Sequence, residues 1–316
     1  MITYRTFRNW DPPAIVQLWN SSGLGRGAAR SIRVSDLEGL VLSKPYFDPR
    51  AITLAEDDGR LVGFVHPGFG ATADGSRLSR EFGVIALLMV APTHRRRGIG
   101  RELVRRAERH LRSGGSTVIY AGGIYPLDPF YLGLYGGSEM PGILQSDAAA
   151  HRLFKSLGYR PVDECLVFQR ELAGPVPAAG RQVRSWAHRV EFCMDSQPAL
   201  ADWWSVCQYA ALEYADFSLR LRDSGELLAR ARGWEMYPLH NASDALAVGI
   251  VNLEVDAAHR GQRLGTVLMI QILRHCRDIG LTLVEIQTMV RNEPARRLYA
   301  RLGFREVDRG VVYRAS

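Results

Sequence analysis

The sequence predicts a folded α/β protein made of two similar domains. Its 316 residues exceed what one hydrophobic core usually organises, so two domains of about 150 residues each are expected. One pattern occurs twice in the same order, at 84–111 with 153–168 and again at 248–276 with 298–313. In each copy a buried strand leads through a basic, glycine-containing turn into an amphipathic helix. This alternation favours helices packed on a sheet.

A stretch with the composition of a linker separates the two copies. Residues 173–180 read AGPVPAAG, a run of small residues and prolines that is typical of a connection between domains. We therefore expect an N-terminal domain at 1–172, a linker at 173–180 and a C-terminal domain at 181–316.

The elements of each domain follow from local patterns. Apolar and polar residues that alternate predict strands, a 3.6-residue apolar period predicts helices, and Asp57–Arg60 predicts a hairpin turn. In the first domain the expected strands are 2–8, 51–56, 61–66 and 84–90, and the expected helices are 13–22, 34–42 and 101–111. In the second domain the expected strands are 190–194, 217–222, 227–236, 246–255 and 282–289, and the expected helices are 200–214, 264–276 and 293–302.

The first copy is longer than the second. Arg95 and Leu153 are 58 positions apart, whereas the matching Arg260 and Leu298 are 38 positions apart, so the first copy carries about 20 extra residues. These residues fall in the segment 120–147, which is rich in Gly, Tyr and Pro. Such a composition is typical of a long surface or pocket loop.

Charge and composition narrow the class of protein. The net charge of +7 comes almost wholly from arginine, because Lys44 and Lys155 are the only lysines. Arginine binds phosphate in a bidentate way, which favours an anionic partner, although a preference for arginine codons gives the same count. No apolar run reaches the length of a membrane span, and the N-terminus lacks the apolar core of a secretory signal, so we expect no membrane and a cytoplasmic protein. The four cysteines form no C-x-x-C pair, so no metal is expected.

The turn after each central strand is a candidate anion site. The two turns read VAPTHRRRGIG at 90–100 and VDAAHRGQRLG at 255–265. Free backbone N–H groups at a helix start attract phosphate, and glycine lets the phosphate approach the main chain, so a pyrophosphate is the expected occupant. Neither turn matches G-x-G-x-x-G or a G-K-[ST] phosphate loop, which disfavours a Rossmann or Walker site.

Two motifs resemble the GCN5-related N-acetyltransferase (GNAT) family. Arg95–Gly100 (RRRGIG) matches the family's acetyl-CoA motif [R/Q]-x-x-G-x-[G/A], and Asn292–Phe304 (NEPARRLYARLGF) matches its second block. The resemblance implies a fold of two tandem GNAT-type domains, each a mixed, mostly antiparallel sheet flanked by helices. It also implies an acetyl-CoA-dependent N-acetyltransferase in which a primary amine attacks the thioester directly.

The resemblance assigns the acetyl-CoA contacts to both turns and to backbone amides of the central strands. The implied residues of the first domain are Leu88, Met89, Val90, Arg95, Arg96, Arg97, Gly98, Ile99, Gly100 and Arg101. The implied residues of the second domain are Leu253, Val255, Arg260, Gly261, Gln262, Arg263, Leu264, Gly265, Thr266 and Asn292. Asn292 is also expected to cap the following helix. The second turn departs from the motif, because Arg263 replaces its first glycine.

Catalysis is expected in the second domain. Tyr299 is the candidate general acid for the departing thiolate, whereas Phe154 stands at the matching position of the first domain and cannot donate a proton. An aromatic packing role is the alternative for Tyr299. Glu254 and Glu285 are the candidate bases, and each is equally compatible with a solvent-facing strand carboxylate. The first domain is then expected to bind acetyl-CoA.

A second class of function stays open beside the enzyme. A non-catalytic acyl-CoA-binding or interaction protein with degenerate sites is consistent with Phe154 and Arg263. Nucleic-acid binding is disfavoured because no reader motif occurs. The acceptor is expected to be a small-molecule or peptide amine, and the chain a monomer or a homodimer. Aromatic residues of 120–135, with Trp234 and Tyr237, are candidates for an acceptor pocket or for core packing.

Overall fold

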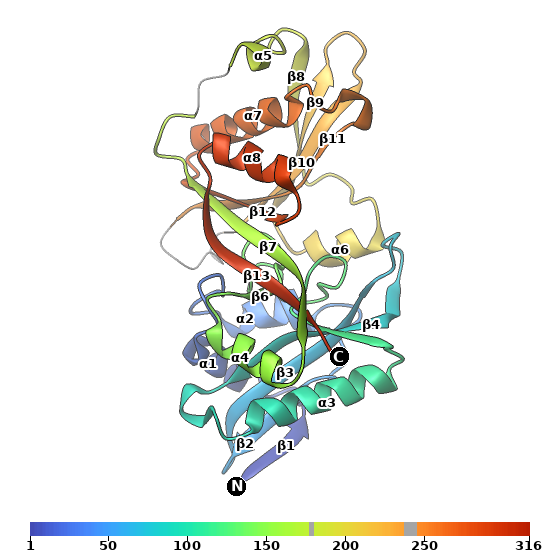
Figure 1. The fold of residues 1–316 in the computed structure, drawn as a ribbon, viewed down its shortest axis with the longest axis vertical. Coiled ribbons are helices and arrows are strands. Elements are labelled where there is room, and N and C mark those ends of the chain that lie inside the picture. The colour runs from blue at the N-terminus through green and yellow to red at the C-terminus, as the bar shows by residue number, and fades with distance from the viewer. Residues whose placement is uncertain (177–179, 237–244) are drawn as a thin grey trace.

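The computed structural model describes residues 1–176, 180–236 and 245–316. Tyr237 and the middle of the predicted linker, 177–179, lie outside these residues. The molecule is elongated, with the N-terminal half at the bottom of Figure 1 and the second half above it. In the described part of the chain, thirteen strands form one continuous sheet. Its strand pairs are antiparallel except for two parallel pairs, β4 with β5 and β11 with β12, so the mixed, mostly antiparallel α/β architecture is confirmed.

The described first half contains seven strands, and the four strands and three helices that the sequence predicts there occur in the expected order. Its strands are β1 (Ile2–Thr6), β2 (Thr53–Asp57), β3 (Arg60–Ala71), β4 (Leu78–Val90), β5 (Val118–Ala121), β6 (Ile143–Leu144) and β7 (Arg160–Glu171). Its helical segments are α1 (Pro12–Ser22), α2 (Val34–Leu37), the π-helical η1 (Glu38–Leu42), the 3-10 turn η2 (Pro92–His94), α3 (Ile99–Ser113) and α4 (Ala148–Ser156).

The described part of the second half has the same kinds of elements as the first half, and its helix α6 is shorter than predicted. Its strands are β8 (Val190–Ser196), β9 (Tyr214–Leu221), β10 (Leu227–Glu235), β11 (Ala247–Val255), β12 (Leu283–Met289) and β13 (Arg305–Arg314). Its helical segments are α5 (Arg181–Arg184), α6 (Trp203–Tyr209), the 3-10 turn η3 (Ala257–His259), α7 (Leu264–Asp278) and α8 (Glu293–Arg301).

One prediction of local structure is wrong. The helix expected at 200–214 is confined to α6, because Asp202 caps its start by accepting from the Ser205 N–H at 2.8 Å and Tyr214 already pairs with Trp234 in the sheet. The segment 120–147, predicted as a long surface or pocket loop, has no helix or strand between Ala121 and Ile143, but most of it is buried rather than on the surface. It is rich in buried aromatic and apolar side chains, among them Phe130, Tyr131, Leu132, Leu134, Tyr135 and Met140.

The two halves exchange their last strands. β7, which ends the first half, pairs with β12 of the second half from Leu283↔Glu171 to Met289↔Cys165. β13, which ends the chain, pairs with β7 and then with β5 of the first half at Tyr313↔Ala121. Figure 1 shows β7 and β13 crossing between the halves and the C-terminus lying among elements of the N-terminal half. The division at 173–180 stays a prediction, but the sheet is shared by both halves.

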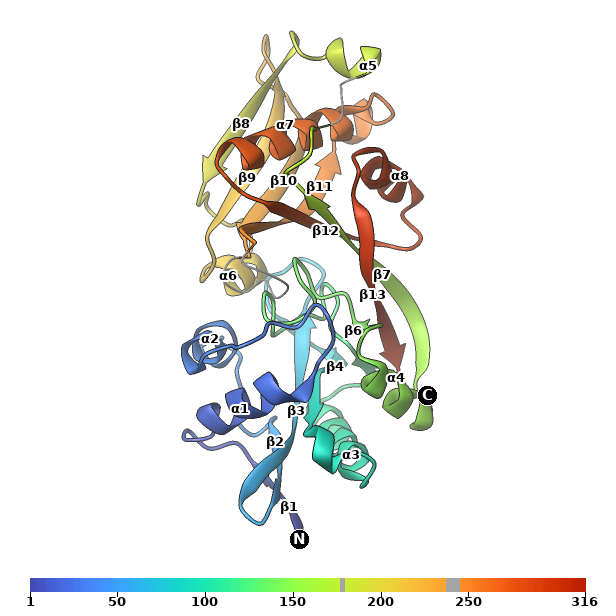
Figure 2. The ribbon, with the colours of Figure 1, turned by 90° about the vertical axis from the view of Figure 1, so that its left-hand side faces the viewer.

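Helices cover both faces of this sheet. Figures 1 and 2 together show α3, α4, α7 and α8 on one face and α1, α2 and α6 on the other. Alternation along β7 follows this arrangement: Leu166 and Phe168 pack in the core beneath α7 and α8, whereas Val167 packs in the core with α1. We call these the α3/α7 face and the α1/α6 face.

The insertion of the first half fills the junction between the halves on the α1/α6 face. Leu132 packs in one apolar cluster with Trp234 and Val251 of the second half. α6 docks on the same insertion, because Gln208 donates to the Asp128 carbonyl at 3.0 Å and the Trp204 indole donates to the Asp128 carboxylate at 3.3 Å. The extra residues of the first copy therefore contribute to the core between the halves.

Replacing Tyr313 tests the strand exchange. Tyr313 of β13 is 1% exposed, lies in the first-half core with Ile119 and Phe154, and its hydroxyl lies 2.7 Å from His151 Nδ1. Tyr313→Ala should lower the free energy of unfolding by about 3–5 kcal/mol, and Tyr313→Phe by about 0.5–1.5 kcal/mol. Urea unfolding measures both values. Hydrogen exchange of β5 should accelerate in Tyr313→Ala, and unchanged protection of β5 would contradict the pairing.

Candidate functional site

In each half the central strand separates from its parallel neighbour partway along its length. β4 pairs with β5 only as far as Ile85↔Ala121, and β11 pairs with β12 only as far as Ile250↔Ile286. Both central strands carry a register shift close to the point of separation, and a β-bulge bends a strand away from its partner. A gap therefore opens beside 86–90 and beside 251–255.

Backbone N–H groups of the central strands face these gaps. The Ala91 N–H donates to the Val62 carbonyl of β3, and successive N–H groups of a strand point to opposite sides, so those of Leu88 and Val90 point toward the gap. The Asp256 N–H donates to the Leu228 carbonyl, which orients the amides of Leu253 and Val255 in the same way. These are the backbone amides that the resemblance assigns to acetyl-CoA.

The turns that follow have the same backbone shape in both halves. Each uses the left-handed region at two alternate positions: Arg96 (φ 65°) and Gly98 (φ 82°) in the first turn, Gly261 (φ 78°) and Arg263 (φ 66°) in the second. Each turn thus has one glycine and one arginine at these positions, in opposite order. Arg263 keeps the conformation of Gly98, at a cost of about 1–2 kcal/mol for a residue with a Cβ. The departure of the second turn from the motif therefore leaves its backbone shape intact.

The first turn borders a cleft of about 650 Å³ between β4, α3 and α4. Predicted residues that line it are Leu88, Met89, Val90, Arg95, Arg96, Gly98, Gly100 and Arg101. A Cβ built on Gly98 has nothing within 4 Å, so the turn faces open space there. A Cβ on Gly100 lies 3.0 Å from Leu153, and this glycine therefore allows α3 to pack closely against α4.

The second turn borders a larger cleft of about 1200 Å³ between β10, β11, α7 and α8. Predicted residues that line it are Leu253, Glu254, Val255, Arg260, Gly261, Arg263, Leu264, Gly265, Thr266, Asn292 and Tyr299. The cleft thus contains the turn, the unpaired end of β11 and the candidate acid together. The residues of both turns fit the diphosphate of acetyl-CoA, because free helix N-terminal amides and arginines face open space.

Two of the arginines hold the turns in shape. Arg95 Nε donates to the Val90 carbonyl at 3.1 Å, and the Arg95 guanidinium also donates to the Ser22 carbonyl. Arg260 Nε donates to the Val255 carbonyl at 3.2 Å in the same way. Arg97 lies 3.5 Å from the Asp57 carboxylate. Arg96 and Arg101 also line the first cleft and make no such contact with the residues that the structure describes.

Four other residues that are predicted to contact acetyl-CoA take part in core packing, a hydrogen bond or a helix cap. Ile99 and Leu264 are buried in the cores under their helices, at 2% and 1% exposure. The Gln262 carbonyl accepts from the Trp186 indole at 3.0 Å. Asn292 caps α8 by accepting from the Ala295 N–H at 3.3 Å, so its predicted capping role is confirmed.

Tyr299 both packs in the core and lines the second cleft. It is 3% exposed, and its ring centroid lies 5.7 Å from that of Phe168 and 5.8 Å from that of Phe304. Burial raises the pKa of the Tyr299 hydroxyl, with further contributions from Glu139 and Cys165. The hydroxyl is therefore protonated at neutral pH, which is the form that donates.

The two candidate bases have different surroundings. Glu254 is an exposed residue of the cleft and lies 2.9 Å from Arg230. Glu285 is 2% exposed and points to the α1/α6 face, since its neighbours Val284 and Ile286 pack under α7. It accepts from the Ser138 N–H at 2.6 Å.

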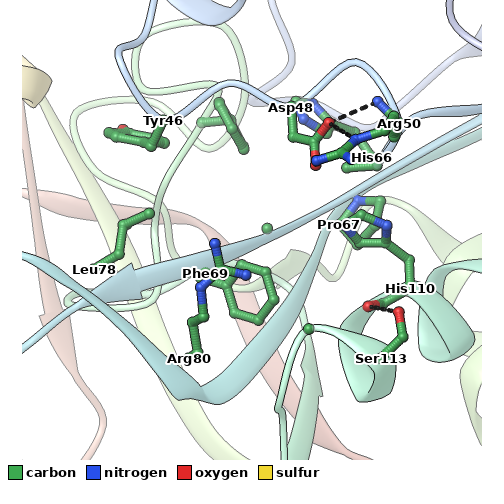
Figure 3. A pocket seen from close by; sticks show the side chains of 14 residues that line it. Tyr46, Asp48, Arg50, His66, Pro67, Phe69, Leu78, Arg80, His110 and Ser113 are labelled. Atoms are coloured by element: carbon green, nitrogen blue, oxygen red, sulfur yellow. Dashed lines mark hydrogen bonds and ion pairs between the residues drawn. The ribbon is translucent and has the colours of Figure 1, made fainter.

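A third cavity lies at the opposite end of α3 from the first turn. It has a volume of about 380 Å³ and is lined by His66, Arg80, His110 and Phe130, among others. Figure 3 shows Arg80 beside Phe69, and the Arg80 guanidinium lies 5.1 Å from the centroid of that ring. Burial lowers the pKa of His66 to about 3, so this imidazole is neutral at physiological pH. The 15 residues of α3 span about 22 Å, which separates this cavity from the first turn.

A family model described as the acetyltransferase (GNAT) family matches residues 27–135 and 181–304. The fold and the two clefts thus define a tandem acetyltransferase, and the chain belongs to the GNAT family. The matches support an enzyme of the acetyltransferase class. GNAT enzymes use acetyl-CoA.

Similar proteins have the same tandem layout. A mycothiol acetyltransferase of Actinosynnema mirum is 29% identical over 286 residues, covering 85% of both chains, and one of Nocardia farcinica is 28% identical, covering 83% of this chain and 82% of the relative. A tandem GNAT protein from the clavulanic acid biosynthesis pathway superposes with a TM-score of 0.70 at 18% identity, covering 100% of this chain and 98% of that structure. The predicted tandem GNAT organisation is confirmed.

Within the described residues, no group of three or more His, Cys, Asp or Glu side chains is arranged to hold a metal ion. No helix in the same residues is long and apolar enough to cross a bilayer.

A carboxylate introduced at either turn should weaken acetyl-CoA binding. Gly98→Glu and Arg263→Glu each direct a negative charge at the position expected for the diphosphate, so each should weaken binding at its cleft at least tenfold, measured by calorimetry. Gly59→Glu is the matched control, because Gly59 has φ 81° and open space around its Cβ but lies on the β2–β3 hairpin. Equal weakening by all three variants would show that the turns do not bind the diphosphate.

Proposed function

We propose that the chain transfers the acetyl group of acetyl-CoA to the primary amine of a small molecule, with catalysis in the second cleft and acetyl-CoA binding without transfer in the first. One observation carries the division of roles. Tyr299 lines the second cleft beside the unpaired end of β11, whereas Phe154 is 2% exposed and packs against Tyr159 and Tyr313 in the first-half core.

The second cleft supplies the groups that direct transfer needs. The amine nitrogen forms a bond to the acyl carbon while the N–H groups of Leu253 or Val255 stabilise the negative charge on the acyl oxygen. The C–S bond then breaks, and Tyr299 donates its proton to the leaving sulfur. Solvent restores the proton to Tyr299. The proton lost by the amine needs a base near the acyl carbon.

We infer that the acceptor is a small-molecule amine, because relatives that match most of this chain are named mycothiol acetyltransferases. We therefore take mycothiol without its acetyl group as the first acceptor to test, followed by glucosamine and a short peptide amine. Free CoA thiol, measured with a thiol reagent, reports transfer. An amine-dependent release of thiol supports the function, and its absence for every amine contradicts it.

Replacing Tyr299 by phenylalanine tests the assignment of the second cleft. Tyr299→Phe removes the proton donor and keeps the ring, so kcat should fall by about 10²–10⁴ while the Kd for acetyl-CoA stays within twofold. Tyr313→Phe is the control, since it also removes a buried tyrosine hydroxyl but lies outside the second cleft. An unchanged kcat in Tyr299→Phe would contradict catalysis by this residue.

A further inference from the structure

The insertion of the first half reaches across to β12 of the second half. The Ser138 N–H donates to Glu285 Oε1 at 2.6 Å, and the Ser138 carbonyl accepts from the Trp234 indole at 3.0 Å. Gln287 Nε2 donates to the carbonyls of Gly136 and Glu139 at 2.7 and 3.1 Å. Side chains of β10 and β12 therefore fix the backbone of 136–139 against the α1/α6 face of the second half.

Contact between the two segments is close. A Cβ on Gly137 lies 2.0 Å from Glu285 Oε1, and a Cβ on Gly249 of β11 lies 2.6 Å from the Ser138 side chain. Any larger residue at either position displaces the insertion from the sheet. Glycine at Gly137 also permits its φ of 95°.

Hydrogen bonds anchor the backbone around Glu139, but they do not involve the Glu139 side chain. It is half-buried, and its carboxylate has no hydrogen bond or ion pair with another residue in the part of the chain that the structure describes. Glu139 is also the only charged residue between Asp128 and Asp147 in the sequence. A carboxylate that is removed from water normally has a partner, so a half-buried one without a partner is a candidate for work on a substrate.

Tyr299 and residues 136–139 lie on opposite faces of the sheet, close to the point where β11 and β12 separate. Beyond Ile250↔Ile286 these strands no longer pair, and Gln287, which anchors Glu139, is the first residue of β12 past that point. Tyr299 lies on the α3/α7 face of the gap, and 136–139 lie on the other face. Burial, followed by the charge of Glu139, raises the pKa of the Tyr299 hydroxyl.

We propose that Glu139, contributed by the first half, is the general base for acetyl transfer in the second half, so that both halves complete one active site. This inference rests on the proposed function. The acyl group lies at the separation of β11 and β12, and Glu139 takes the proton that the amine nitrogen loses as it bonds to the acyl carbon. Tyr299 protonates the leaving sulfur from the opposite face, and Glu139 returns its proton to solvent.

The other two carboxylates are less suited to this task. Both oxygens of Glu285 already accept hydrogen bonds, Oε1 from Ser138 and Oε2 from Gln169 Nε2 at 2.7 Å. We assign Glu285 a positioning role, because it holds the backbone next to Glu139. Glu254 is exposed and engaged by Arg230.

The surroundings of Glu139 raise the pKa of its carboxyl, so this group acts as a base under mildly alkaline conditions. Burial, followed by the charges of Asp128 and Glu285, raises the pKa of Glu139 to about 8. The other titratable groups that its charge affects are Cys165 of β7, Tyr209 of α6 and Tyr299 of α8. Protonated Glu139 cannot accept a proton, so activity should rise with pH up to about 8.

The test compares Glu139→Gln with the intact chain on an amine acceptor that the intact chain acetylates. Glu139→Gln should lower kcat/KM by about 10²–10⁴ and abolish the rise in kcat/KM that ends near pH 8, with the Kd for acetyl-CoA within twofold. An aromatic amine, which is uncharged over this range, removes titration of the acceptor from the profile. Glu139→Asp should retain the rise with a smaller loss, and exposed Glu38→Gln is the control.

The outcomes separate this inference from the proposed function. If the intact chain acetylates no amine, the proposed function fails. If the intact chain is active and Glu139→Gln keeps kcat/KM within threefold with the same pH profile, the role of Glu139 is overturned. If Glu139→Gln does not fold, Glu139→Asp decides: a loss of about tenfold with the pH profile retained supports the base, and unchanged activity contradicts it.

Discussion

The antiparallel pairing of β7 with β13 is the interaction on which the rest of this structure depends. Each half ends in a strand that its own sheet would use, and each strand instead joins the sheet between the halves. Backbone pairing from Arg305↔Gln169 to Arg314↔Arg160 therefore replaces a flexible connection with a continuous sheet. Its two ends are β1 and β8, so the exchange leaves no exposed edge at the junction.

This shared sheet explains why one half can serve the other. The pairing of β7 with β12 brings residues that follow β5 against the α1/α6 face of β11 and β12. The extra residues of the first copy fill that place with Ser138 and Glu139, and Trp234 and Gln287 hold them there. Glu139 of the first half and Tyr299 of the second half then lie on opposite faces of the sheet, close to the point where β11 and β12 separate. The repeat thus produces two similar clefts with different chemical content.

Much of this organisation could be predicted from the sequence. The repeat predicts the tandem α/β fold, and the turn motif locates both clefts, because a strand, a helix start and a glycine follow each other along the chain. Asn292 signals its cap in the same local way. Such features depend on neighbouring residues, which sequence patterns describe well.

Long-range features were not predictable in the same way. Nothing local in β13 shows that it pairs with β5, because the two strands are about 190 residues apart and either half offers a similar partner. Glycine and tyrosine in 120–147 predict a loop, but Phe130, Tyr131 and Tyr135 are buried in the core of the first half with α1, which the local pattern does not show. Arg95 matches a phosphate ligand in the motif, and its contacts with Val90 and Ser22 require the folded turn. The signal for Glu139 was a single carboxylate in an otherwise uncharged run.

A crystal structure with a ketone analogue of acetyl-CoA, in which a CH₂ group separates sulfur from the carbonyl, tests the shared active site most directly. We predict that the diphosphate binds at Arg260–Gly265, that the carbonyl oxygen lies about 3 Å from the amide of Leu253 or Val255, and that the carbonyl carbon lies in the gap between Tyr299 and Glu139. An analogue bound only in the first cleft, or with its carbonyl turned away from the gap, would contradict the account.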